Sequence, residues 1–421
     1  MLQVPGSRLG LTGQVLGRDA LPVLVPAWED LCARCVEDNV YYSPRYARAL
    51  LENVARDQNI SFAVVWEDSR LVGMLPFMQP KPSIPLLRPA GQAWQTKYTY
   101  SCTPLLDTLR KTEAAEGLLD LLDSVGAGEW IIPTVNTQGA ACQALIAALA
   151  ARGLPWRFVE RFQRASLEAG VSFDEHMQRH VSAKRRKDLA RNRRRLEQLG
   201  TIGHESHRSG EELERAVSAF LKIEASGWKG KRGTALACDE RTRIFALDAF
   251  NGKDANSTCR ADVLTLNGTP IAVSLVAFAG RTGFAVKCAY DEAYRNCSVG
   301  VLLEVEVIRG FLSENWAARL DAATTGAHVL DSLWPGRVEV ADLMFSLSPR
   351  HPELRLPAFQ LCDHIKRSVR SSIKRALMSV QDWSQAGEAA RQARPMHRSW
   401  QRLWSPHFLQ ARSRTRLRSA P

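Results

Sequence analysis

The stretch from Ala261 to Phe311 constrains the fold of this chain more than any other. Two apolar runs, Ala261–Leu266 and Thr269–Ala279, are separated by the dipeptide Asn267-Gly268. Because Asn-Gly readily adopts the positive φ angles of a two-residue hairpin turn, the runs are predicted to pair as antiparallel strands. A third run, Thr282–Tyr290, is predicted to extend this sheet.

The third strand is followed by a polar bend and then by a predicted helix, Val299–Phe311, with apolar residues along one face. A turn of small residues that opens a helix exposes backbone N–H groups at the positive end of the helix dipole, which suits a phosphate or diphosphate. Gly300 would let such an anion approach the backbone closely. The structural alternative is that Gly300 only tightens the connection between strand and helix.

The composition predicts a soluble globular protein. The 421 residues, 45% hydrophobic and 24% charged, suffice for two domains with full cores. No membrane span and no signal peptide are predicted, and the odd number of nine cysteines is typical of a reducing compartment, so we expect a cytoplasmic location. The Cys32–Cys35 pair lacks the further ligands of a zinc site, so no metal is expected.

Most of the net charge of +12 lies at the C-terminal end, where residues 362–421 hold 13 Lys and Arg against three acids. We expect a basic helix over Asp363–Leu377 and a disordered tail from Gln381 onward. Arginines and tryptophans in the tail would suit peripheral association with an anionic membrane surface, or nucleic acid. A solvated extension is the simpler interpretation.

A second cationic segment, His180–Gly200, has eight Lys and Arg residues on a predicted helix with Ser182 as N-cap. Three interpretations stay open, namely a solvated helix face, a contact for an anionic small molecule or polymer, and a nucleic-acid contact. Nucleic acid is the least favoured because interleaved aromatics are absent. The basic loop that follows the next helix holds Trp228, which is large enough to cover a ligand or to plug a domain junction.

Several segments together carry a resemblance to a known family. In chain order they are RRRLEQLG, SGWKGKRGT, IAVSLVAF, FAVKCAYDEAY, CSVGVLLEVEVIRGF and LDAATTGAHVLDSLWPGR, preceded nearer the N-terminus by YSPRYARAL, LVGMLPF and TPLLD. This series, spanning roughly residues 20–350, resembles the acetyltransferase family named after the CelD cellulose-biosynthesis proteins, within the GNAT superfamily and related to the FemAB peptidyltransferases. The resemblance implies an α/β protein with tandem GNAT-like folds, in which mixed sheets are flanked by helices. The implied domains are 1–170, 171–360 with the acyl donor, and a basic tail, 361–421.

The same resemblance implies where an acyl-CoA donor, acetyl-CoA in the simplest case, would bind. The typical GNAT loop reads R/Q-x-x-G-x-G/A, of which only Arg295 and Gly300 are matched here. The implied donor-binding residues are Arg295, Ser298, Val299 and Gly300. Acyl transfer to an amine needs a base and an acid, for which the candidates are Asp321 as base, Tyr290 as acid and His328 as a reserve base. Trp228 and Lys287 are the candidate acceptor-site residues.

The function that the resemblance implies is acyl-CoA-dependent N-acyl transfer to an amine, such as an amino sugar or another saccharide amine of surface-polysaccharide biosynthesis. Two alternatives remain. One is a FemAB-like aminoacyl or peptidyl transferase that uses charged tRNA, with the basic helix as its RNA contact. The other is a GNAT-fold scaffold without catalytic activity in a polysaccharide assembly.

Overall fold

The hairpin predicted at Asn267-Gly268 is present in the computed structural model. β10 (Cys259–Leu266) pairs antiparallel with β11 (Thr269–Ala279), and the two turn residues have φ angles of 50° and 76°. β12 (Thr282–Tyr290) pairs with β11, and α10 (Val299–Glu314) follows it. The predicted order of three strands, a turn and a helix is therefore confirmed.

The structure describes residues 2–4, 10–81, 90–252, 258–324 and 328–347, with six isolated positions between 357 and 368. The chain divides into two compact units, Met1–Phe359 and Gln360–Pro421. The predicted basic helix and tail lie outside the described residues, apart from those isolated positions. All of the predicted site residues belong to the first unit.

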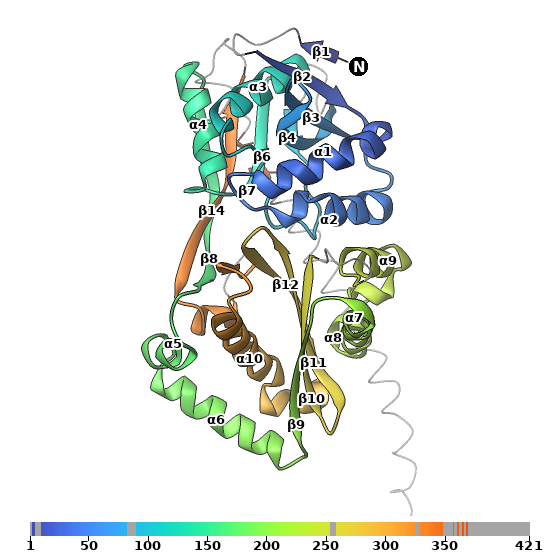
Figure 1. Ribbon diagram of the computed structural model, residues 1–421, viewed down its shortest axis with the longest axis vertical. Coiled ribbons are helices and arrows are strands. Elements are labelled where there is room, and N and C mark those ends of the chain that lie inside the picture. Colours follow the sequence, from blue (N-terminus) through green and yellow to red (C-terminus); the bar gives the residue numbers. More distant parts are fainter. Residues whose placement is uncertain are drawn as a thin grey trace, which may run out of the picture. The chain divides into compact units, whose positions relative to one another are not determined.

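The described strands of this unit form one 14-stranded mixed sheet (Figure 1). Its order is β1-β2-β3-β4-β5-β7-β14-β8-β13-β12-β11-β10-β9, with β6 paired to β4. Besides β10–β12 the strands are β1 (Leu2–Val4), β2 (Leu11–Leu16), β3 (Ile60–Glu67), β4 (Arg70–Lys81), β5 (Ala90–Ala93), β6 (Leu105–Leu106), β7 (Glu129–Asn136), β8 (Trp156–Glu168), β9 (Ile202–His207), β13 (Arg319–Asp321) and β14 (Gly336–Ser346).

The helices begin at local capping signals. The side chains of Ser172, Ser182 and Asp239 each accept a hydrogen bond from a backbone N–H in the first turn of α5, α6 and α9, so the predicted Ser182 cap is confirmed. Besides α10 the helices are α1 (Leu21–Arg34), α2 (Pro44–Ala49), α3 (Lys111–Ser124), α4 (Ala140–Ala151), α5 (Phe173–His180), α6 (Ala183–Glu197), α7 (Gly210–Ser226), α8 (Trp228–Lys231) and α9 (Glu240–Ala249). The basic loop predicted around Trp228 contains the single helical turn α8.

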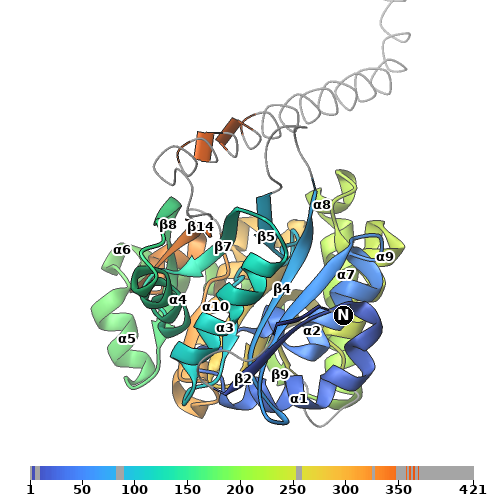
Figure 2. The same ribbon diagram turned by 90° about the horizontal axis from the view of Figure 1, so that it is seen from above.

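Helices cover both faces of the central strands. Alternate residues of β10 and β11 belong to different apolar clusters: Val263, Val273 and Leu275 pack with α7, whereas Leu264 and Val276 pack with α10. This division follows from the two-residue period of a strand, which turns successive side chains to opposite faces. Figure 1 shows α7 and α10 on the two sides of these strands, and Figure 2 gives the view from above. In the described part of the chain, no helix is long and apolar enough to cross a membrane.

The two halves of the unit exchange their last strands. β8, which follows the N-terminal elements, pairs with β13 of the C-terminal half, and β14 pairs with β7 of the N-terminal half as well as with β8. Each half contributes an antiparallel meander and one parallel pair, β5 with β7 and β12 with β13. The boundary expected at residue 170 thus follows β8 inside a continuous sheet.

A buried ion pair ties β8 to β13. Arg164 on β8 donates from Nη1 to Oδ1 of Asp321 over 3.2 Å and from Nη2 to the carbonyl of Tyr100 over 2.8 Å. Both charged side chains are less than a tenth exposed. One guanidinium therefore connects β8, β13 and a segment of the N-terminal half.

Replacing Arg164 by Met is expected to destabilise the protein by about 3–5 kcal/mol, because it leaves the Asp321 carboxylate buried without its partner. Urea unfolding followed by circular dichroism measures the change. The matched control is Arg161→Met on the same strand, whose ion pair with Glu339 is half exposed, and which should cost less than about 1 kcal/mol. Equal, small losses in both variants would contradict the role given to Arg164.

Candidate active site

The candidate site lies where two parallel strands part. β12 and β13 pair only through Thr282–Phe284 and Arg319–Asp321, after which β13 ends while β12 continues to Tyr290. The edge of β12 beyond Phe284 therefore faces a gap rather than a neighbouring strand. The backbone groups on that edge are available to a ligand.

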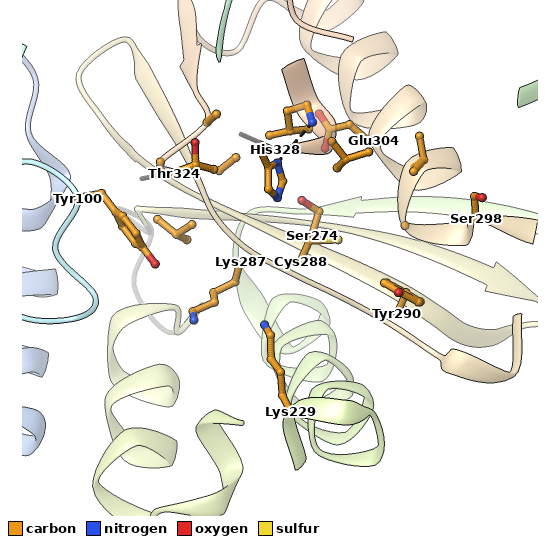
Figure 3. A pocket seen from close by; sticks show the side chains of 18 of the residues that line it. Tyr100, Lys229, Ser274, Lys287, Cys288, Tyr290, Ser298, Glu304, Thr324 and His328 are labelled. Carbon is orange, nitrogen blue, oxygen red and sulfur yellow. Dashed lines mark hydrogen bonds between the residues drawn. The ribbon is translucent and has the colours of Figure 1, made fainter. Parts of the chain in front are cut away.

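A cavity of about 760 Å³ occupies this gap (Figure 3). It is lined by residues of β11, β12, the turn before α10, α10 itself and the segments that follow β13, together with one residue each from α8 and the N-terminal half. They are Tyr100, Lys229, Ser274, Ala285, Val286, Lys287, Cys288, Tyr290, Arg295, Ser298, Gly300, Val301, Glu304, Ala322, Ala323, Thr324, His328, Val329 and Leu330.

A β-bulge lies in the wall of this cavity. The register between β11 and β12 shifts where Leu275 pairs with Lys287 and Val276 pairs with Ala285, so Val286 has no partner on β11. A bulge bends its strand and redirects local backbone groups, and bulges are over-represented next to active sites. The bulge therefore marks the point on β12 from which a backbone group can turn into the cavity.

The turn into α10 presents backbone donors at one end of the cavity. Ser298 precedes the helix with a φ of 51°, and its hydroxyl accepts a hydrogen bond from Asn192 of α6. Among the described residues, no group accepts a hydrogen bond from the amides of Val299 and Gly300. The exposed Arg295 lies on the preceding turn. The start of α10, with these two amides and the positive end of the helix dipole, and the Arg295 cation thus lie at the same end of the cavity.

Tyr290 packs beside this turn rather than at the parting of the strands. A Cβ added to Gly300 would lie 3.1 Å from Cδ1 of Tyr290, and the tyrosine is 41% exposed. Along an extended strand, Tyr290 stands roughly 16 Å from Ala285, close to where β12 loses its partner. Tyr290 therefore belongs to the end of the cavity at the turn into α10.

Asp321 does not line the cavity. Its Oδ1 accepts hydrogen bonds from Arg164 and from the backbone N–H of Ala323. The carboxylate is thus engaged within the protein, so we assign it a structural rather than a proton-transfer position.

Glu304 and His328 lie beside each other in Figure 3, and both line the cavity. Glu304 is only 6% exposed, its Oε1 accepts a hydrogen bond of 3.0 Å from the Trp334 indole, and burial raises its pKa to about 8. Burial lowers the pKa of His328, whose Nδ1 accepts a hydrogen bond from the Leu330 amide. A neutral imidazole bonded in this way carries its proton on Nε2.

Two lysines lie toward the other end of the cavity. Lys287 of β12 and Lys229 of α8 both line it, and burial lowers the pKa of Lys287 to about 8. Trp228 lies outside, in a smaller adjoining pocket with Glu224, and its backbone N–H donates to Glu292. Of the two predicted acceptor-site residues, the cavity contains Lys287 only.

The structure thus gathers six of the nine predicted site residues around one cavity, namely Tyr290, Arg295, Ser298, Gly300, His328 and Lys287. Val299 is buried, but its amide belongs to the same turn. Sequence reasoning missed Glu304, although its position four residues after Gly300 on the predicted helix places both on one helix face. It also missed Tyr100, for which the sequence holds no comparable signal. In the described part of the chain, no group of three or more His, Cys, Asp or Glu residues could hold a metal ion.

Comparison with known proteins bears on this geometry. Residues 183–326 match the acetyltransferase (GNAT) domain. This segment contains the parting strands, the turn and α10. The predicted fold class is confirmed, and the GNAT part of the predicted resemblance is supported, whereas membership of the CelD-like family stays a prediction. No curated protein matches the sequence.

Solved structures share the fold across both halves. The chain superposes on FemX with a TM-score of 0.53 and 12% identity, covering 80% of this chain and 98% of that one. The C-terminal domain of a putative lysylphosphatidylglycerol synthetase from Agrobacterium fabrum superposes with a TM-score of 0.50 and 11% identity, covering 81% of this chain and 97% of that one. A protein of unknown function from Bacteroides thetaiotaomicron VPI-5482 superposes with a TM-score of 0.51 and 10% identity, covering 80% of this chain and 100% of that one. At these identities the similarity concerns the fold alone.

Gly300→Trp is expected to abolish coenzyme A binding without unfolding the protein. The indole would cover the two amides, and the partly exposed Tyr290 ring, 3.1 Å from an added Cβ, can turn away to make room. Isothermal titration calorimetry measures binding, and thermal unfolding checks the fold. Ser313→Trp, at an exposed position of the same helix, is the control and should bind normally. Unchanged affinity in Gly300→Trp would remove the donor assignment.

Proposed function

We propose that this protein is an acyl-CoA-dependent N-acyltransferase that acts on an amine acceptor. The observation that carries the proposal is a cavity that runs from unpartnered amides at the start of α10 to the parting of β12 and β13, within a segment that matches a GNAT domain. A helix N-terminus suits the diphosphate of the donor, and an unpaired strand edge suits its amide-containing arm.

The residues present fit such a donor. The amides of Val299 and Gly300 and the side chain of Arg295 would hold the diphosphate, with the Ser298 hydroxyl beside them. Tyr290, next to Gly300, would flank this end instead of serving as the acid at the reacting end. The donor supplies an activated acyl carbonyl, and the simplest such group is acetyl.

The chain itself supplies the groups for proton transfer. Acylation needs a neutral amine, so a base must take a proton from the acceptor's ammonium group. Glu304, a cavity-lining carboxyl with a pKa near neutrality, is suited to this task, and the Nε2–H of His328 is suited to donate a hydrogen bond or proton. These roles differ from those predicted from the sequence, in which Asp321 is the base and His328 is the reserve base.

An acceptor from surface-polysaccharide biosynthesis, such as an amino sugar, rests on the CelD resemblance alone, as does a non-catalytic scaffold role in such an assembly. The scaffold predicts binding of a partner without turnover of any acyl-CoA. Thiol release in the presence of acetyl-CoA and a panel of amines separates the scaffold from the enzyme.

Aminoacyl transfer from charged tRNA is the second candidate. It is favoured by α6, whose exposed cations include Lys184, Lys187 and Arg194, and whose Asn192 contacts the turn before α10. If this candidate holds, tRNA and not coenzyme A should raise the melting temperature. The reverse result supports the acyl-CoA donor.

Glu304→Gln is expected to lower kcat/KM by about 10²- to 10⁴-fold, because the amide cannot accept the proton. The ratio of wild-type to variant kcat/KM should rise with pH and level off above about 8, since the carboxylate that forms there is the active base. Rates of thiol release across this pH range, with one acceptor, provide the ratio and cancel the titration of the acceptor itself.

Glu306→Gln is the matched control, since Glu306 lies on the same helix but pairs with Arg193 and Arg309 outside the cavity. It should leave the pH profile unchanged. A pH-independent ratio for Glu304→Gln would rule out the base assignment while leaving the donor site intact.

A further inference from the structure

One end of the cavity carries more positive than negative charge. Lys287 and Lys229 line it, and Lys97 lies just outside. The ammonium groups of Lys287 and Lys97 both stand over the Tyr98 ring, 5.2 Å and 4.9 Å from its centroid. Three cations therefore surround one ring and the adjoining cavity wall.

The carboxylate that acts on Lys287, that of Glu224, is already engaged. Glu224 is 4% exposed, and its Oε1 accepts from Nζ of Lys229 over 2.8 Å while its Oε2 accepts from the Leu236 amide over 2.8 Å. Among the described residues, no carboxylate forms an ion pair with Lys287. Lys287 thus contacts the Tyr98 ring and feels Glu224 only at a distance, without a direct ion pair.

The surroundings of Lys287 disfavour its charge. The pKa of Lys287 is lowered to about 8. Burial is the largest cause, Glu224 opposes the shift, and the ammonium groups of Lys229 and Lys97 add to it. A cation held in such a place is stabilised by an anion that enters the cavity.

This end is remote from the turn that opens α10. Figure 3 shows Tyr100 and Ser298 on opposite sides of the cavity, with Ser274 and His328 between them and Lys287 on the Tyr100 side. If the donor enters at Ser298, the acceptor occupies the end marked by Tyr100. An acceptor that is only a cation would be repelled by Lys287 and Lys229.

We propose that the acceptor carries an anionic group, a carboxylate or a phosphate, near its amine, and that Lys287 binds this group at the Tyr100 end of the cavity. The inference rests on the proposed function, because it assigns the two ends of the cavity to donor and acceptor. The acceptor class is therefore an amino acid or a phosphorylated amine rather than a neutral amino sugar or a simple amine.

Matched acceptor pairs test this assignment by thiol release with acetyl-CoA. Glucosamine 6-phosphate against glucosamine tests phosphate, and β-alanine against β-alaninamide tests carboxylate. At least one anionic member should show a KM about tenfold or more below that of its neutral partner, the effect of one charge-assisted hydrogen bond. The pair that discriminates identifies the anion.

Substitutions at two lysines test which side chain causes the preference for an anionic acceptor. Lys287→Met should remove the preference for the anionic acceptor, and Lys287→Arg should retain most of it. Lys97→Met is the matched control, since it deletes an equal charge over the same ring but outside the cavity, and should keep the preference. A preference that survives in Lys287→Met, or equal KM values within both pairs in the wild type, would overturn the inference.

Chemical labelling gives a readout that does not depend on turnover. Lys287 should react readily with a neutral acylating ester near its pKa of about 8, as followed by peptide mass spectrometry. Glucosamine 6-phosphate or β-alanine should protect it, whereas their neutral partners should not. Protection without turnover would support the anion site and count against the proposed function, whereas turnover without selective protection would do the reverse.

Discussion

The early end of the pairing between β12 and β13 is the constraint on which the rest of this structure depends. Three residue pairs hold the strands together, and the last of them includes Asp321, whose carboxylate is anchored by Arg164. Beyond that pair, β12 has an open edge, a bulge at Val286 and a cavity beside it. If the pairing extended further along β12, the added strand would fill the gap that holds the cavity. Loss of the Arg164 contact would leave the buried Asp321 carboxylate without its partner.

The strand exchange explains why the cavity draws on both halves of the chain. β8 belongs to the N-terminal sequence but supports β13, and its Arg164 also holds the carbonyl of Tyr100. The side chain of Tyr100 then forms one end of a cavity whose other walls come from residues 229–330. The two halves therefore depend on each other for the site as well as for the sheet.

The charges along the cavity are arranged in a sequence that suits a two-substrate reaction. Amide donors and Arg295 lie at one end, and a buried carboxyl with a raised pKa lies between them and the other end, where Lys287 has no direct ion pair and Lys229 is paired with Glu224. The pKa values of Glu304 and Lys287 are shifted for the same physical reason, which is that burial removes the water that would otherwise solvate their charged forms.

The sequence by itself determined the features that depend on neighbouring residues. Asn267-Gly268 specified the hairpin, Ser182 the start of α6, and the small residues before Gly300 the turn into α10, because turns and caps are decided by local backbone chemistry. Only the tertiary structure decided that Asp321 forms an ion pair with Arg164 and that Glu304 is buried against Trp334. It also decided that β8 pairs with a strand of the C-terminal half and β14 with a strand of the N-terminal half. These outcomes join residues far apart in the chain, and an alternating or helical pattern shows which face of an element is buried but not which partner covers it.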